Sequence, residues 1–237
     1  TGMYSATGRS VERLLNCVGG YLPMYGDYST GMHQYVMPFM YGVGVSPYEN
    51  ISASSVDQAQ NADLVLMFGN SPADNRMGGA NVVWDYNTVR EAGPEIIHID
   101  YRLNETAAGY PSEWLPIRTG TDAALVAGIA HELITNDWVD LDFLHKYCVG
   151  YDEETMPASA KGQNKSYHDY IMGLGYDKVE KTPEWAAEIT LVPAEKIREL
   201  AAKIHDAKAV FVVQGWGLQR HSNGESATRA VCMLALL

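Results

Sequence analysis

A serine in a glycine-flanked turn is the first candidate for chemistry in this sequence. Residues 25–31 read Tyr-Gly-Asp-Tyr-Ser-Thr-Gly, so the hydroxyl of Ser29 lies beside an acid and two aromatic rings. Gly26 and Gly31 permit backbone angles that a side chain would forbid, and Asp27 can hydrogen-bond to the local backbone. A serine in this setting could be a nucleophile, a metal ligand or an ordinary turn residue. Local chemistry alone favours the turn, because Gly, Asp and Ser are common there.

Polar residues also follow three short apolar runs that read as buried parallel strands. Runs 64–68, 96–99 and 209–213 are apolar nearly throughout, which is typical of strands covered on both faces. Ligands of an open parallel sheet bind beyond the carboxyl ends of its strands, so the residues after each run are candidates for binding. These candidates are Asn70 and Ser71 after the first run, Asp100 and Arg102 after the second, and Gly215, Trp216 and Gln219 after the third.

The chemistry of these loops fits a nucleotide. The 69–74 loop, with free backbone N–H groups and a following helix start, would suit phosphate oxygens. Asp100 could hold ribose hydroxyls or a guanine edge, and Arg102 could stack on a base or bind phosphate. In a fourth loop, 116–122, the carboxylate of Asp122 could interact with a helix N-terminus or accept two hydrogen bonds from guanine. For any one of these loops a solvated turn is the simpler interpretation. Four such loops at the carboxyl ends of the strands together favour a binding site.

The sequence pattern between these loops predicts an α/β fold. Short β-branched runs alternate with amphipathic helical stretches, which indicates a Rossmann-like parallel sheet with helices on both faces. Helices are predicted over 121–135, where Leu125, Ile129 and Leu133 form one apolar stripe, and from about residue 223 to 237. Two more are predicted to begin at Thr182-Pro183 and at Pro193-Ala194, because proline is favoured at the first helical position.

The strand at residue 209 follows a long polar and helical excursion, so we expect it to begin a different sheet or subdomain. This divides the chain into a Rossmann-like domain of residues 1–206 and the start of a neighbouring α/β domain at residues 207–237. The chain begins at Thr1 without a methionine and stops inside an apolar helical run, so we also expect it to be part of a longer protein.

Composition limits the classes of partner. The 237 residues include 17 Lys+Arg and 29 Asp+Glu, a formal net charge of −12, which argues against nucleic acid as a partner. No apolar run approaches the roughly 18 residues of a membrane helix, so direct membrane insertion is not expected. The three cysteines, Cys17, Cys148 and Cys232, are widely spaced and include no Cys-x-x-Cys pair. This chain alone therefore predicts no iron–sulfur or thiolate zinc site.

Taken together, these segments resemble the catalytic subunit of the dimethyl sulfoxide reductase family, molybdenum enzymes that carry two molybdopterin guanine dinucleotides. The resemblance is greatest to the membrane-anchored, three-subunit bacterial enzymes, and the segments follow the family order over nearly the whole chain. One departure is Tyr101, since the family commonly has proline between the acid and the arginine. The matching segments are Gly-Asp-Tyr-Ser-Thr (26–30), Phe-Gly-Asn-Ser-Pro (68–72), Ile-Asp-Tyr-Arg (99–102), Pro-Ile-Arg-Thr-Gly-Thr-Asp-Ala-Ala-Leu (116–125), Lys-Tyr-Cys-Val-Gly-Tyr-Asp (146–152), Gln-Gly-Trp-Gly (214–217) and Gln-Arg-His (219–221).

The resemblance implies roles for particular residues. Ser29 is similar to the serine whose oxygen ligates molybdenum, and would be both catalytic and metal-binding. Three residues, Gly215, Trp216 and Gln219, resemble contacts at the entrance to the cofactor site. Those that resemble residues holding one pterin guanine dinucleotide are Asn70, Ser71, Asp100, Arg102, Gly120 and Asp122.

The resemblance also implies the setting of the whole protein. Its cofactor would be molybdenum bis(molybdopterin guanine dinucleotide), with a [4Fe-4S] domain before Thr1 and further domains after Leu237. It would reduce a small S-oxide or N-oxide in anaerobic respiration, with an iron–sulfur subunit and a membrane anchor subunit as partners, on the periplasmic side of a bacterial membrane. We expect the 237 residues alone to fold but to be inactive.

Other interpretations stay open at the level of sequence. The chain could belong to a selenate or other oxyanion reductase of the same family, and tungsten could replace molybdenum. It could also be a nucleotide-binding domain without a metal, or an interaction module in which the loops are solvated turns. A plain dinucleotide fingerprint is absent, because neither Gly42 nor Gly215 begins a Gly-x-Gly-x-x-Gly.

Overall fold

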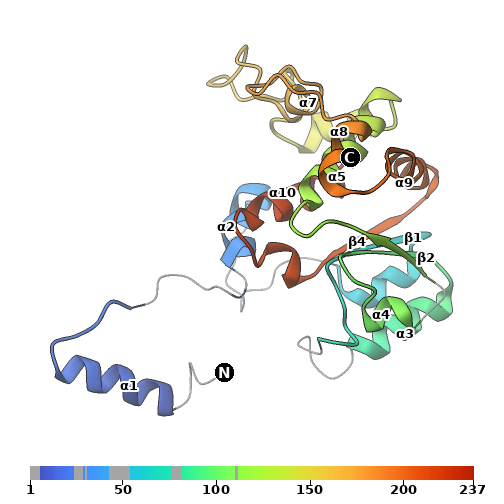
Figure 1. The fold of residues 1–237 in the computed structure, drawn as a ribbon. Helices are drawn as coiled ribbons and strands as arrows, with labels where there is room; N and C mark the ends of the chain where they lie inside the picture. The colour runs from blue at the N-terminus through green and yellow to red at the C-terminus, as the bar shows by residue number, and fades with distance from the viewer. Residues whose placement is uncertain (1–5, 24–28, 30, 43–53, 76–81, 110–111) are drawn as a thin grey trace.

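The computed structural model (Figure 1) describes residues 6–23, 29, 31–42, 54–75, 82–109 and 112–237. Gly26 and Asp27, which the sequence places around Ser29, lie outside this part of the chain. Within the described residues, every helix is too short or too polar to span a lipid bilayer.

A four-stranded sheet organises the described residues. Its strands are parallel and lie in the order β3-β2-β1-β4. The α/β fold with a parallel sheet is therefore confirmed, and the three apolar runs are strands. β3 was not predicted, because it has only four residues and ends at a proline, which edge strands tolerate. The strands are β1 (Leu64–Phe68), β2 (Glu95–Asp100), β3 (Glu113–Pro116) and β4 (Val210–Gln214).

The last strand belongs to the same sheet as the others. Leu64 of β1 lies opposite Glu95 of β2 on one side and Val210 of β4 on the other. The prediction that this strand begins a different sheet is therefore wrong. The excursion before it is long because β3 and β4 lie at opposite edges, so the chain must cross a whole face of the sheet. The division of the chain into domains at residue 206 stays a prediction.

Helices cover both faces of the sheet, as predicted, because residues of β1 alternate between two apolar clusters. Leu64, Leu66 and Phe68 pack in one cluster, and Val65 and Met67 pack in the other. Figure 1 shows the sheet between these layers. The first face is covered by α5 (Asp122–Thr135), α8 (Pro183–Thr190), α9 (Ala194–Asp206) and α10 (Gly224–Leu234), and the second by α3 (Val82–Ala92) and the 3-10 helix η2 (Val56–Asn61).

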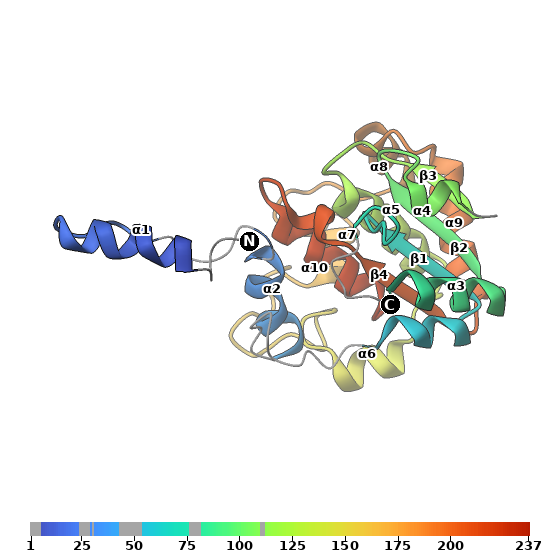
Figure 2. The same ribbon diagram turned by 90° about the horizontal axis from the view of Figure 1, so that it is seen from below.

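Local signals explain where several helices begin. The hydroxyl of Thr182 accepts a hydrogen bond from the backbone N–H of Trp185 over 3.2 Å, and Pro183 is the first residue of α8. Leu125, Ile129 and Leu133 of α5 are buried, as their spacing predicts. α2 packs against α10, whereas α1 projects away from the sheet (Figure 2). The remaining elements are α1 (Ala6–Cys17), α2 (Gly31–Tyr41), α4 (Glu105–Ala108), α6 (Leu141–Tyr147), α7 (Tyr167–Ile171) and the 3-10 helix η3 (Trp216–Gln219).

Candidate functional site

The carboxyl ends of the four parallel strands lie on the same side of the sheet, which we call the sheet edge. A groove opens there between the loops that follow β1 and β4. Strand order reverses at β1, because β2 and β3 follow on one side of it and β4 lies on the other. Open α/β sheets bind ligands at this reversal. The groove has a volume of about 180 Å³, and its lining includes four residues singled out from the sequence, namely Asn70, Ser71, Gly215 and Trp216.

A glycine keeps the two sides of the groove in contact. The backbone N–H of Gly215 donates to the oxygen of Phe68 over 2.8 Å. A Cβ atom at Gly215 would lie 2.1 Å from the backbone oxygen of Gly69, far inside van der Waals contact. Only glycine therefore allows the loop after β4 to approach the loop after β1 this closely.

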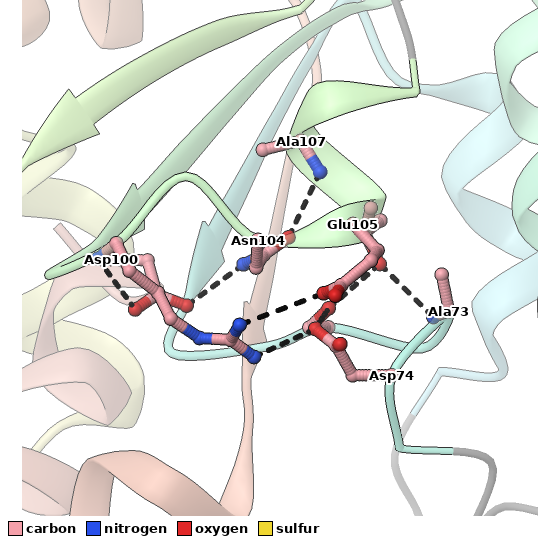
Figure 3. A network of polar contacts seen from close by, with 9 residues as sticks. Ala73, Asp74, Asp100, Asn104, Glu105 and Ala107 are labelled. Atoms are coloured by element: carbon pink, nitrogen blue, oxygen red, sulfur yellow. Dashed lines mark hydrogen bonds and ion pairs between the residues drawn. The ribbon is translucent and has the colours of Figure 1, made fainter.

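The loops after β1 and β2 are joined by a polar network, which Figure 3 shows from close by. The hydroxyl of Ser71 donates to Asp74 over 2.5 Å and lies 3.0 Å from the hydroxyl of Thr106. The guanidinium of Arg102 forms ion pairs with Asp74 at 2.9 Å and with Glu105 at 3.6 Å. Ser71 and Arg102 therefore meet at one carboxylate.

Asp100 is anchored at the end of β2. Its carboxylate accepts a hydrogen bond from the amide of Asn104 over 2.8 Å, and its backbone oxygen accepts one from the indole N–H of Trp114 over 3.0 Å. Asn104 in turn caps α4, since its side-chain oxygen accepts from the backbone N–H of Ala107 over 2.9 Å. Asp100 as a whole is only 9% exposed. Hydrogen bonds within the protein therefore hold the Asp100 side chain and backbone in place.

The backbone of the 69–74 loop is less available to a ligand than the sequence suggests. The N–H of Gly69 donates to the oxygen of Ile99 over 2.9 Å, and the N–H of Ala73 donates to the hydroxyl of Thr106 over 3.0 Å. The next described helix, α3, begins only at Val82. The prediction of free N–H groups is therefore wrong at these two positions, because the neighbouring loop and strand use them. The side chains of Asn70 and Ser71 remain at the groove.

Asn70 is held by a buried tyrosine. The hydroxyl of Tyr86, on α3, donates to the side-chain oxygen of Asn70 over 3.2 Å. Tyr86 is 4% exposed, and burial raises the pKa of its phenol, so the hydroxyl stays protonated and can donate. This contact anchors the side chain of Asn70 at the groove.

The loop after β3 brings Gly120 and Asp122 against the loop after β4. Gly120 has a φ of +78°, a backbone conformation that favours glycine, and a Cβ there would lie 3.6 Å from the ring of His221. Burial raises the pKa of the Asp122 carboxyl to about 6. A hydrogen bond from its own backbone N–H and the proximity of His221 favour its ionised form, whereas the charge of Asp100 disfavours it.

One ring nitrogen of His221 is buried and lacks a hydrogen-bond partner among the described residues. Its Nδ1 lies 2.7 Å from the backbone oxygen of Ser222. Its Nε2 is buried and has no hydrogen-bond partner among the described residues. Buried polar atoms are rarely left unpaired, so this atom and the carboxylate of Asp122 suit a polar ligand at this edge.

Ser29 is held by the loop after β4, which also lines the groove. The side-chain N–H₂ of Gln219 donates to the backbone oxygen of Ser29 over 2.7 Å, and its side-chain oxygen accepts from the N–H of Met32 over 3.1 Å. Gln219 is only 1% exposed and also donates to the backbone oxygen of Trp216 over 3.0 Å. The predicted metal ligand and the predicted entrance residues therefore come together.

A second residue of this loop, Arg220, was not among the predicted site residues. Its Nη2 donates to the Oγ of Ser29 over 2.6 Å and its Nε donates to the backbone oxygen of Ser29 over 3.0 Å. Its guanidinium also lies over the ring of Trp216, 5.3 Å from the centroid. The position of Arg220 directly after Gln219 was the available signal, but the sequence does not show which loop an arginine will contact.

Comparison with known proteins identifies the family of the chain. A family model described as "Molybdopterin oxidoreductase" matches residues 1–237. The chain is 50% identical over 228 residues to the dimethyl sulfoxide reductase DmsA of Escherichia coli, a match that covers 96% of this chain and 27% of that protein. It is 32% identical over 243 residues to a trimethylamine-N-oxide reductase of Haemophilus influenzae, covering 99% of this chain and 27% of that protein. The chain thus spans about 27% of the length of these relatives.

A solved structure shares the fold. The acetylene hydratase of Pelobacter acetylenicus superposes with a TM-score of 0.54 at 23% sequence identity, over 77% of this chain and 23% of that one. At this level of identity the likeness concerns the arrangement of the helices and strands alone.

Proposed function

Because the chain belongs to the molybdopterin oxidoreductase family, we propose that it is the part of a longer molybdenum enzyme that holds one guanine dinucleotide of the cofactor and supplies a serine ligand to the metal. The family implies a molybdenum–molybdopterin cofactor. The guanine dinucleotide form, two copies per metal and a [4Fe-4S] cluster elsewhere in the protein are part of the proposal.

The residues at the sheet edge fit such a group. The groove lies where the strand order reverses, and Gly215 keeps its two walls together where any side chain would separate them. The buried carboxylate of Asp122 and the unpaired Nε2 of His221 offer an acceptor and a second polar contact on the same side. Guanine presents two neighbouring N–H donors, which a carboxylate can accept, and Arg102 can bind a phosphate.

The cofactor, when bound, supplies the two-electron redox chemistry, and the protein supplies its binding, orientation and electrostatics. Asp122 and Asp100 would accept hydrogen bonds from the base and the ribose. Asn70, Ser71 and Arg102 would contact the phosphates along the groove. Ser29 would present its oxygen to the metal from a turn that Gln219 holds in place.

For the whole protein, we propose the reduction of an S-oxide or N-oxide, on the strength of the named activities of its relatives. An iron–sulfur subunit and a membrane anchor would deliver electrons, and the complex would work on the periplasmic side of the membrane. These partners and this location rest on the family resemblance alone.

The observation that carries the proposal is the meeting of Ser29 with the loop after β4, the same loop that lines the groove with Gly215 and Trp216. The experiment is the Ser29→Ala substitution in the full-length enzyme, assayed for molybdenum, guanine nucleotide and turnover of dimethyl sulfoxide and trimethylamine N-oxide. We expect the guanine nucleotide to be retained and turnover to fall by more than about a hundredfold, beyond the usual cost of losing a residue that only supports a ligand.

Ser159→Ala is the matched control, because Ser159 is exposed in a turn of the 151–166 segment. Its turnover should equal that of the unmodified enzyme. Unchanged turnover in Ser29→Ala would remove this residue from the metal site, and full-length protein without molybdenum or guanine nucleotide would refute the cofactor assignment.

A further inference from the structure

We propose that Arg220 is the positioning residue for Ser29, and that Trp216 is the platform that holds the Arg220 guanidinium in place. This rests on the proposed function, since it assigns a role toward the metal ligand. The same two residues connect the groove to the proposed metal ligand. Trp216 lines the groove, and Arg220, whose guanidinium lies over Trp216, donates to the hydroxyl of Ser29.

The geometry of the contact fixes both parts of Ser29. One donor of the guanidinium reaches the side-chain oxygen over 2.6 Å, and another reaches the backbone oxygen of the same residue over 3.0 Å. The donors of a guanidinium are coplanar and keep a fixed separation. Two bonds to one residue therefore restrict the side-chain rotamer of Ser29 as well as the position of its backbone. Gln219 binds only backbone groups here, so it cannot restrict that rotamer.

The guanidinium is itself restrained from the side of the groove. It lies 5.3 Å from the ring centroid of Trp216, within the range of a cation–π contact. Trp216 begins η3 directly after Gly215, whose N–H donates to the oxygen of Phe68 at the end of β1, and a bond from Gln219 to the oxygen of Trp216 closes η3 on itself. Movement of the groove wall would therefore move the guanidinium, and with it the hydroxyl of Ser29.

The contrast with Arg102 supports a dedicated role. Arg102 pairs with two carboxylates, Asp74 and Glu105. Among the described residues no carboxylate forms an ion pair with Arg220, whose charge instead faces a neutral hydroxyl and an aromatic ring. An arginine hydrogen bond to an oxygen is strong because the donor is permanently charged. Such a donor suits an oxygen that binds a metal as an anion.

The test uses the full-length enzyme with its cofactor and four variants, namely Arg220→Met, Arg220→Lys, Ser29→Ala and, as the control, Arg198→Met. Arg198 is partly exposed on α9, where it pairs with Glu184 and Glu132, and within the described part of the chain it forms no hydrogen bond or ion pair with Ser29 or the loop after β4. Each protein is examined for molybdenum and guanine nucleotide content, for kcat and KM, and by X-ray absorption at the metal, which reports the oxygen ligand directly.

We expect Arg220→Met to keep its molybdenum and guanine nucleotide, to weaken the serine oxygen signal, and to lower kcat by roughly 10–100-fold with little change in KM. Arg220→Lys should recover part of the signal and part of kcat, because lysine can donate to the hydroxyl but cannot make both contacts. Arg198→Met should match the unmodified enzyme. If Arg220→Met fails to load cofactor, Arg220→Lys decides by the same readouts.

The outcomes separate this inference from the proposed function. An unchanged oxygen signal in Ser29→Ala would mean that the proposed metal ligand is wrong. A lost signal in Ser29→Ala, together with an unmodified signal and unmodified kcat in both Arg220 variants, would overturn the positioning role of Arg220 alone. A kcat loss in Arg220→Lys equal to that in Arg220→Met, with the oxygen signal intact in both, would also overturn it.

Discussion

The side chain of Gln219 donates a hydrogen bond to the backbone oxygen of Ser29 over 2.7 Å, although 190 residues separate the two in the sequence. The same side chain accepts from the N–H of Met32, so one buried amide joins Ser29 to the first turn of α2. The placement of Ser29 therefore depends on the far end of the chain. Whatever shifts the loop after β4 should shift the hydroxyl.

Gln219→Leu should release this turn. The substitution keeps much of the volume but leaves the N–H of Met32 without its acceptor, at a cost of about 1–3 kcal/mol where water cannot reach it, while the oxygen of Ser29 keeps only the donor from Arg220. We expect amide hydrogen exchange at Met32 to accelerate by roughly tenfold or more, because local opening becomes easier. Mass spectrometry of the peptide that contains residue 32 measures this.

Gln163→Leu serves as the comparison, since Gln163 is exposed and donates to the backbone oxygen of Ser159 in its own segment. It should leave exchange at Met32 unchanged. Equal protection of Met32 in Gln219→Leu and the unmodified protein would show that the turn is held by other contacts.

Gly215→Ala should separate the walls of the groove. The added Cβ would lie 2.1 Å from the oxygen of Gly69, and a backbone atom cannot yield as a flexible side chain can. We expect a cost of about 3 kcal/mol or more, at the upper end for overpacking, seen as a lower melting temperature and a loss of guanine nucleotide from the purified enzyme. The matched control is Gly217→Ala, whose Cβ would lie 3.5 Å from the same oxygen, an ordinary contact. Similar losses in both variants would contradict this account of the groove.

Asp122 predicts a pH dependence. Burial raises its pKa from 3.8 to about 6, so the folded state holds this proton more tightly than the unfolded state does. The contribution to stability is therefore complete below about pH 4 and is lost as pH rises through 6, on the order of 3 kcal/mol in total. In the cofactor-free full-length protein, Asp122→Asn should remove this component from the pH profile of the melting temperature. Asp206→Asn, at the exposed end of α9, should preserve it.

Nucleotide binding should follow the opposite trend with pH. An ionised carboxylate can accept hydrogen bonds from two N–H groups of guanine through its two oxygens. In a neutral carboxyl group one of these oxygens carries a proton and is a donor, so it no longer suits an N–H group. Calorimetry with guanosine monophosphate on the cofactor-free protein should therefore show affinity that falls by up to about tenfold per pH unit below pH 6. An affinity that is constant from pH 5 to about 7 would exclude Asp122 as the acceptor.

Asp74→Asn should free Arg102 for a phosphate. The carboxylate of Asp74 pairs with Arg102 at 2.9 Å and would compete with an anionic ligand. A surface pair of this kind contributes about 0–1 kcal/mol, so we expect guanosine diphosphate to bind up to roughly fivefold more tightly. Arg102→Gln should instead weaken it and flatten its salt dependence. Unchanged affinity in Arg102→Gln would exclude this arginine from the phosphate site.

The sequence by itself determined the elements of the fold and the residue types at the sheet edge. Continuous apolar runs identified β1, β2 and β4, because strands covered on both faces have no polar face to show. The Thr182-Pro183 pair placed the start of α8, because capping is a local interaction. Asp100 and Asp122 were recognisable as candidates, because they end a strand and begin a helix.

Only the tertiary structure decided how these parts combine. It joined β4 to β1, because strand pairing depends on contacts between segments far apart in the sequence. It paired the backbone N–H groups of Gly69 and Ala73 with acceptors in neighbouring segments. It also buried Asp122 enough to raise the pKa of its carboxyl group. It also brought Arg220 to Ser29 across 191 positions of the chain. Side-chain chemistry and local capping can be read along a sequence, whereas burial and long-range hydrogen bonds arise only when the chain closes on itself.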